Sequence, residues 1–265
     1  MKRNQRLRWV VGSGAVIVLL VAVALGALVR RGGDDGTLER VRASGQLRVG
    51  LDASFPPFES LDAAGSVVGL DADLARAIAT TLGAEPVFVN VGFDGLYDAL
   101  LVGRVDAIIS GLPYDSRRTQ DVIYSDSYFN AGQLLLVRAD DVSPAGSESL
   151  SGRKVAVEWG SLADMEARRL KQGADGMETL PQPTAQEALS ALVNGQADAA
   201  IADAVSVYQF VGEDRGQVRI VETLTDEPYV IATRSRSRRL AEAIDEALIE
   251  LRESGALDML LAKWF

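Results

Sequence analysis

The most constraining feature of this sequence is a strand pattern that occurs twice. Residues 102–111 read VGRVDAIISG and residues 194–203 read NGQADAAIAD, and each follows a segment with the apolar spacing of an amphipathic helix. Each contains a short apolar run that stops at small or polar residues, as a buried strand of a parallel sheet does. A recurring unit of this kind predicts two α/β lobes of similar plan. The strand ends at Ser110-Gly111 and Ala202-Asp203 should then occupy equivalent positions.

The first lobe alternates strand and helix signals. Apolar strand candidates at residues 46–51, 87–89 and 105–109 are separated by a helix over residues 71–82 and a second helix that opens at Phe93. This order predicts a parallel sheet with right-handed crossovers. The intervening segment DASFPPFES, residues 52–60, is interpreted as a loop.

Two extended runs, Gln133–Asp140 and Pro228–Arg234, connect the predicted lobes. Residues 239–265 have a helical apolar stripe, and we expect them to return to the first lobe. The predicted fold class is therefore α/β, with two lobes that are each a mostly parallel sheet flanked by helices. The predicted boundaries are 37–136 with 228–265 for lobe 1 and 137–227 for lobe 2. Two hinge strands suit a fold that closes over a ligand.

The N-terminal segment is long and apolar. Val10–Val29 contains no charged residue, which is enough to cross a bilayer as a helix. More basic residues precede this run than follow it, which predicts a cytoplasmic N-terminus and an exported body. We predict a retained signal/anchor helix over residues 1–31, followed by a linker at 32–36. A cleaved signal peptide is the alternative, because Ala22-Val23-Ala24 is a small-x-small site. The body is extracytoplasmic in both cases.

Composition excludes several function classes. The formal net charge is −10, and the six basic residues of positions 1–31 have no acidic neighbours there, so the body is more acidic still. Such a body repels phosphates, and no nucleic-acid partner is expected. The chain has no cysteine and no histidine. Disulfides, thiolate or imidazole metal sites and Ser-His-Asp catalysis are thereby excluded, and neither a metal nor a cofactor is expected.

The two equivalent strand ends carry opposite charges. Arg118 lies just past the first, whereas Asp203 ends the second. A ligand held between them should carry both an anion and a cation, as a free amino acid does. Asp203 could instead cap the following helix. Gly160-Ser161 precedes a helix whose free N–H groups favour a carboxylate.

Further candidate residues lie near the first strand. Asp52 and Phe55 follow it, and Phe93 opens a helix. Each has an ordinary structural alternative. The phenylalanines, Phe58 included, could be core residues, and Asp52 could cap a turn.

Five segments together resemble the extracytoplasmic solute-binding proteins of family 3, the polar amino-acid receptors of ABC importers. They appear in matching order and spacing: GQLRVGLDASFPPFE, GLDADLARAIATTLG, LVGRVDAIISGLPYDSRR, YSDSYFNAGQLLLVR and ESGALDMLLAKWF. The resemblance covers the chain from about Thr37 to Phe265 and implies the type II periplasmic-binding-protein fold. It also implies a small-molecule ligand, an ABC permease partner and a monomeric receptor.

The resemblance also implies roles for individual residues. Arg118 would bind the α-carboxylate and Asp203 the α-ammonium of an amino acid. The other implied positions are backbone groups of Ser110 and Gly111, a carboxylate site at Ser161 and the Leu162 N–H, aromatic walls at Phe55 and Phe93, and a side-chain contact at Asp52. Two positions depart from the family: Pro113 replaces the usual Ser or Thr, and Trp159 stands where a polar residue is common.

The leading interpretation is a binding protein that hands a small amphoteric solute to a membrane permease. An enzyme is the second possibility, because the resemblance extends to periplasmic cyclohexadienyl (arogenate) dehydratases. Glu158 and Glu59 would be the proton donors to consider besides Asp52. A third possibility is an extracellular amino-acid sensor. No catalytic residue is assigned.

Overall fold

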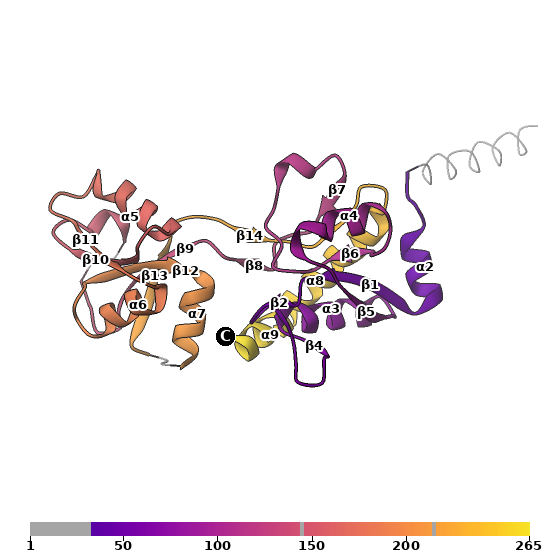
Figure 1. Ribbon diagram of the computed structural model, residues 1–265, viewed down its shortest axis with the longest axis horizontal. Helices are drawn as coiled ribbons and strands as arrows, with labels where there is room; N and C mark the ends of the chain where they lie inside the picture. Colours follow the sequence, from indigo (N-terminus) through magenta and orange to yellow (C-terminus); the bar gives the residue numbers. More distant parts are fainter. Residues whose placement is uncertain (1–32, 144–145, 214–215) are drawn as a thin grey trace, which may run out of the picture.

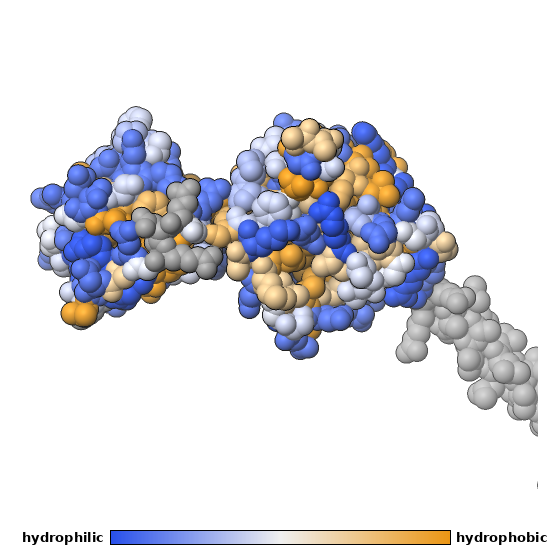
Figure 2. All heavy atoms as spheres, turned by 90° about the horizontal axis from the view of Figure 1, so that it is seen from below, coloured by the Kyte–Doolittle hydropathy of each residue, from blue (hydrophilic) through white to orange (hydrophobic). Residues whose placement is uncertain are grey.

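The structure, a computed structural model, describes residues 33–143, 146–213 and 216–265. Two lobes lie beside each other and are joined by a narrow waist (Figures 1 and 2). The predicted N-terminal anchor, residues 1–31, lies outside the described residues. Within the described ranges, no helix combines the length and apolarity needed to span a bilayer.

The first lobe contains a five-stranded sheet in the order β5-β1-β6-β15-β7. Its strands are β1 (Gln46–Leu51), β5 (Glu85–Asn90), β6 (Ala107–Ile108), β7 (Val122–Tyr124) and β15 (Ala232–Arg234). Its helices are α2 (Thr37–Ser44), α3 (Leu70–Thr81), α4 (Leu96–Leu101), α8 (Arg238–Glu253) and α9 (Ala256–Trp264), with short 3₁₀ turns η1 (Phe93–Gly95) and η2 (Ser116–Arg118).

The second lobe repeats this plan in the order β11-β10-β12-β9-β13. Its strands are β9 (Gln133–Arg138), β10 (Lys154–Glu158), β11 (Glu178–Gln182), β12 (Ala199–Asp203) and β13 (Val218–Thr223). Its helices are α5 (Leu162–Lys171), α6 (Ala185–Val193) and α7 (Ala204–Glu213), with the 3₁₀ turn η3 (Ser147–Ser149).

The repeat expected from the sequence extends to individual hydrogen bonds. Ahead of β6, Asp106 exchanges two bonds with Arg48 of β1: its N–H donates to the Arg48 carbonyl, and its carboxylate accepts from the Arg48 N–H. Ahead of β12, Asp198 makes the same pair of bonds with Lys154 of β10. The two-lobed α/β fold is therefore confirmed.

Both sheets are mixed, because each receives one strand from a chain arriving from the other lobe. In the first lobe β15 runs antiparallel to β6 and β7, and in the second β9 runs antiparallel to β12 and β13. The two connections meet between the lobes as β8 (Phe129–Asn130) and β14 (Pro228–Tyr229), an antiparallel pair (Figure 1). So short a ribbon leaves little packed surface to resist a change of angle between the lobes.

One local prediction was wrong, and the C-terminal segment is helical as predicted but interrupted. Residues 52–60 are not a simple loop, because β2 (Ser54–Phe55), β3 (Glu59–Leu61) and β4 (Val67–Val68) form a small antiparallel sheet. The Pro56-Pro57 pair interrupts the alternation that would have signalled these strands. The C-terminal helix is also divided, because Gly255 has the left-handed φ of 74° and separates α8 from α9.

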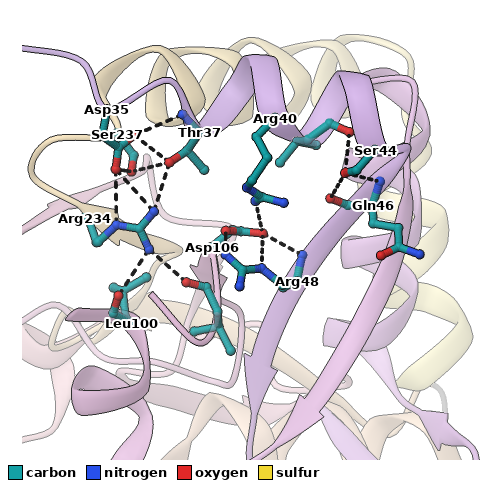
Figure 3. A network of polar contacts seen from close by, with 12 residues as sticks. Asp35, Thr37, Arg40, Ser44, Gln46, Arg48, Leu100, Asp106, Arg234 and Ser237 are labelled. Atoms are coloured by element: carbon teal, nitrogen blue, oxygen red, sulfur yellow. Dashed lines mark hydrogen bonds and ion pairs between the residues drawn. The ribbon is translucent and has the colours of Figure 1, made fainter. Parts of the chain in front are cut away.

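A polar network fixes α2 to the sheet of the first lobe (Figure 3). The fully buried carboxylate of Asp106 accepts from the backbone N–H and the guanidinium of Arg48 and pairs with Arg40 of α2. Burial raises the pKa of Asp106, but the hydrogen bonds from Arg48 and Arg40 outweigh burial and leave the pKa below its ordinary value.

The residues just before α2 are held as well. Asp35 accepts hydrogen bonds from Thr37, from Arg234 of β15 and from the Ser237 hydroxyl (Figure 3). Asp34 accepts from the N–H of Arg239 in α8. The chain is therefore bound to the first lobe from Asp34 onward, inside the segment predicted as a linker.

Candidate functional site

A cleft of about 440 Å³ lies where the two lobes face each other. The first lobe contributes Phe55 and Pro56, and the connecting strands and their flanks contribute Ala131, Gln133, Glu227 and Tyr229. The second lobe contributes Glu158, Ser161, Leu162, Ala163, Ala185, Ile201, Ala202, Asp203, Val205, Ser206 and Gln209. A second hollow of about 310 Å³ on the first lobe is lined by Asp52, Ser54, Phe55, Glu59, Phe93, Gly111, Pro113 and Tyr229. Phe55 and Tyr229 line both spaces, so the two hollows adjoin.

The second lobe supplies a helix N-terminus and a carboxylate. Ser161 is the N-cap of α5: its hydroxyl accepts from the Asp164 N–H at 3.3 Å and donates to the Glu158 carbonyl at 2.8 Å. Leu162, the first residue of α5, lines the cleft, and free N–H groups at a helix start attract an anion. Asp203 ends β12 and caps α7 by accepting from the Ser206 N–H at 2.9 Å. Asp203 therefore caps a helix, as its structural alternative predicted, and it also lines the cleft.

Asp52 organises the wall of the first lobe. Its carboxylate accepts from the Ser54 hydroxyl at 2.7 Å and from the Phe93 N–H at 2.8 Å, which fixes the start of η1. Phe55 and Phe93 are 40% and 44% exposed, whereas Phe58 is fully buried and stacks on Phe55 with ring centroids 5.2 Å apart. Of these three phenylalanines only Phe58 is therefore a core residue, and the rings of Phe55 and Phe93 line the smaller hollow.

Ser110 and Gly111 form the floor of this wall, and the Ser110 hydroxyl and the Gly111 N–H are already bound. The Ser110 hydroxyl donates to Glu59 at 2.6 Å and accepts from the Asp52 N–H at 3.0 Å. The Gly111 N–H donates to Asp71 at 2.5 Å. Gly111 has a φ of +47°, and a Cβ there would lie 2.9 Å from the Phe55 ring, so only glycine fits. The Ser110 hydroxyl and the Gly111 N–H are therefore engaged within the protein.

Arg118 and Trp159 lie outside the residues that line the two hollows. The Arg118 guanidinium sits over the Tyr97 ring at 4.1 Å and is 3.8 Å from the Asp115 carboxylate. Trp159, just past the end of β10, is 71% exposed. The structure therefore brings together nine of the predicted site residues, and Arg118 and Trp159 are not among them. Those that line the hollows are Asp52, Phe55, Phe93, Gly111, Pro113, Ser161, Leu162 and Asp203, and Ser110 lies beneath them.

Sequence reasoning missed a buried pair of acids under the site. Glu59 of β3 and Asp71 of α3 are both fully buried, and they bond to the adjacent residues Ser110 and Gly111. Burial raises the pKa of each, and for Glu59 the negative charge of Asp71 raises the pKa further. Asp71 looked like an ordinary acid in the first turn of a helix, because only the tertiary structure places it against Gly111.

The linings of both hollows are acidic. Asp52 is the partly exposed acid of the smaller one, beside the fully buried Glu59, and Glu158, Asp203 and Glu227 line the larger one. Neither lining includes a lysine or arginine among the residues that the structure describes. A site with several carboxylates, aromatic walls and a helix N-terminus suits a cation that carries one anionic group.

Comparison with known proteins agrees with this geometry. Residues 47–265 match the model of the family described as bacterial extracellular solute-binding proteins, family 3. The L-arginine-binding protein of Pseudomonas aeruginosa is 30% identical over 257 residues, which is 94% of this chain and 96% of that protein.

Two solved structures are similar as well. An ancestral cationic amino acid solute-binding protein is 34% identical with a TM-score of 0.64, covering 86% of this chain and 99% of that one. The unliganded, open L-cystine receptor of Neisseria gonorrhoeae has a TM-score of 0.74 at 22% identity, covering 86% of this chain and 95% of its own, and so shares the fold. With a ligand-sized cleft between two lobes of this plan and a family match that spans both, the chain belongs to the bacterial extracellular solute-binding proteins of family 3.

Proposed function

We propose that this solute-binding protein captures a cationic L-amino acid, with L-arginine as the leading candidate, for an ABC importer. The acidic, aromatic-walled cleft is the observation that carries this proposal. The resemblance to receptors named for arginine and for cationic amino acids supports it.

The ligand's two ends are assigned by charge. Its α-ammonium binds Asp203 in the second lobe, and its side-chain cation lies between Phe55 and Phe93 above Asp52. The start of α5 receives the α-carboxylate. Arg118 joins the carboxylate when the lobes close, which requires its guanidinium to leave the Tyr97 ring.

A thermal-shift screen of the full chain tests the ligand class, because a ligand that binds only the folded protein raises the apparent melting temperature. L-arginine and L-lysine should give the largest shifts, followed by isothermal titration calorimetry for affinity. L-glutamine, L-cystine, L-histidine and L-glutamate serve as comparisons. The largest shift with a neutral or acidic amino acid would contradict the cationic assignment.

Variants then test the assigned contacts. Asp203→Asn and Arg118→Ala should each weaken L-arginine binding by about 2–5 kcal/mol, the range for removing one partner of a buried charge pair. Arg117→Ala is the matched control for the second variant, because Arg117 is the adjacent arginine and its side chain is 87% exposed. Equal losses in Arg117→Ala and Arg118→Ala would remove Arg118 from the ligand site.

We also propose that the protein is a receptor and not an enzyme. Its charged residues suit the binding of a ligand with two opposite charges. Glu158 is the candidate proton donor in the cleft, and it lies at the end of β10 near Ser161. Incubation with arogenate or prephenate should yield no phenylalanine or phenylpyruvate. Turnover that disappears in Glu158→Gln would establish the dehydratase alternative.

For the N-terminal segment, we propose an uncleaved membrane anchor that holds a monomeric body outside the cytoplasm. The charge-free run Val10–Val29 supports it. Intact mass of the protein from native membranes tests the anchor, and a mature chain that starts shortly after Ala24 would refute it. Light scattering of the detergent-solubilised protein tests the monomer.

A further inference from the structure

Two buried carboxyl groups meet directly beneath the ligand site. Glu59 and Asp71 are each fully buried, and they bond to adjacent residues, Glu59 to the Ser110 hydroxyl and Asp71 to the Gly111 N–H. Glu59 Oε2 and Asp71 Oδ1 have no hydrogen-bond partner among the described residues. Carboxylate oxygens are acceptors only, so two such oxygens can bond to each other only if a proton lies between them.

The surrounding donors decide which residue carries that proton. Asp71 Oδ2 accepts from the Gly111 N–H at 2.5 Å and from the Tyr128 hydroxyl at 3.0 Å. Glu59 Oε1 accepts from the Ser110 hydroxyl alone, at 2.6 Å. Asp71 accepts from two donors, which stabilise its ionised form, whereas Glu59 accepts from only one. Glu59 is therefore the member of the pair that keeps the proton. A proton on Glu59 Oε2 that is donated to Asp71 Oδ1 would satisfy both otherwise unpartnered oxygens.

The pair is connected to the ligand-facing residues through two short chains of bonds. On one side Glu59 holds Ser110, whose hydroxyl accepts from the Asp52 N–H. On the other side Asp71 holds Gly111, which lines the hollow. These bonds connect the ends of β1 and β6 to β3 and α3 directly beneath the smaller hollow.

We propose that Glu59 is a positioning residue of the ligand site, where it retains a proton that it shares with Asp71 and so fixes Asp52 and Gly111 in the geometry that binds the ligand. The shared proton also limits the charge beneath the ligand to one. The titratable groups that face the pair are Asp52 at the end of β1, Tyr128 before β8 and Tyr229 of β14. The role in ligand binding rests on the function proposed above, whereas the shared proton does not.

Infrared spectroscopy of the ligand-free full chain at neutral pH tests the proton directly. The wild-type protein should show the carbonyl band of a protonated carboxyl group, which Glu59→Gln removes and Glu85→Gln leaves in place. Glu85 is a matched control, because it is an exposed glutamate at the start of β5 in the same lobe. Absence of the band in wild type, or its persistence in Glu59→Gln, would overturn the inference whatever the protein binds.

Calorimetric titration with L-arginine tests the positioning role. Glutamine can donate to Asp71 and accept from Ser110 as the protonated acid does, so Glu59→Gln should bind within about threefold of wild type. Glu59→Leu retains volume but no polar group, and its affinity should fall by about tenfold or more, as expected when buried hydrogen-bonding groups lose their partner. Circular dichroism establishes that both variants are folded.

Wild-type affinity in both the Gln and the Leu variants would refute the positioning role, as would a Gln variant that is as weak as the Leu variant. If wild type shows the infrared band but binds no L-arginine, the proposed ligand fails and the shared proton is retained. Any ligand found in the thermal-shift screen then replaces L-arginine in the comparison of the two variants.

Discussion

Replacing Glu59 by glutamine should stabilise the protein at neutral pH, and the gain should grow as the pH rises. Burial and the nearby charge of Asp71 raise the pKa of Glu59 far above its ordinary value of 4.5. The folded protein therefore keeps a proton that the unfolded chain releases. Stability associated with the protonated acid is complete below pH 4.5 and is lost progressively as the pH rises toward the raised pKa. A glutamine side chain does not titrate in this pH range, so the variant does not show this loss of stability.

The expected gain in stability follows from the one proton that the folded wild type keeps and the unfolded chain releases. A difference of one bound proton between folded and unfolded states changes the free energy of unfolding by about 1.4 kcal/mol per pH unit. Between about pH 6 and about pH 8 the advantage of Glu59→Gln over wild type should therefore increase by about 2.7 kcal/mol. Titrating groups away from the Glu59–Asp71 pair contribute equally to both proteins and cancel in the difference. The side-chain amide preserves the bonds to Asp71 and Ser110, so little packing is lost.

Urea denaturation of both proteins at these pH values, at constant ionic strength, measures the difference. Glu85→Gln controls for the loss of one negative charge from the same lobe and should follow the wild-type profile. Parallel pH profiles for wild type and Glu59→Gln would refute the shared proton. So would a variant that is less stable than wild type at every pH.

Three further predictions concern stability. Asp106→Asn should lower the free energy of unfolding by about 2–3 kcal/mol, as measured by urea denaturation. The loss is smaller than for a fully buried ion pair, because Arg40 and Arg48 are partly exposed. Because the pKa of Asp106 is lowered, its contribution in wild type is present above the ordinary carboxyl pKa and disappears as the pH falls through the lowered value, so the variant and wild type should converge in acid. Gly69→Ala should cost about 2 kcal/mol or more in thermal denaturation, since its Cβ would lie 2.1 Å from the Phe58 carbonyl oxygen at a φ of +134°. Gly212→Ala should loosen the contact between α7 and the C-terminus, because its Cβ would lie 2.1 Å from the Phe265 oxygen, and hydrogen exchange in α9 should increase.

Much of the fold follows from local patterns. The apolar spacing of helix α3 and the short apolar runs that became β1 and β6 are sequence properties, since the helix period and strand burial act on neighbouring residues. The internal repeat predicted two similar lobes, and the equivalent bonds of Asp106 and Asp198 confirm it. The small sheet at β2–β4 was missed because Pro56-Pro57 interrupts its pattern.

The candidate site was predictable where its residues end a repeated strand. Asp203 and Asp52 were found because a polar residue that ends a buried strand lies at the edge where ligands bind. Tyr229 and Gln133 were not found, because the crossing strands on which they lie have no local pattern that points to the cleft.

The sequence by itself determined that the chain is acidic, lacks cysteine and histidine, and repeats one α/β unit. Only the tertiary structure decided that Arg118 lies over Tyr97 and that Glu59 and Asp71 share a buried space. The physical reason is the separation along the sequence over which each kind of interaction acts. Helix and strand preferences arise between residues close in sequence, whereas burial and charge coupling depend on which segments the completed fold brings into contact. A glutamate in β3 and an aspartate in α3 look like ordinary surface acids until packing removes water from both.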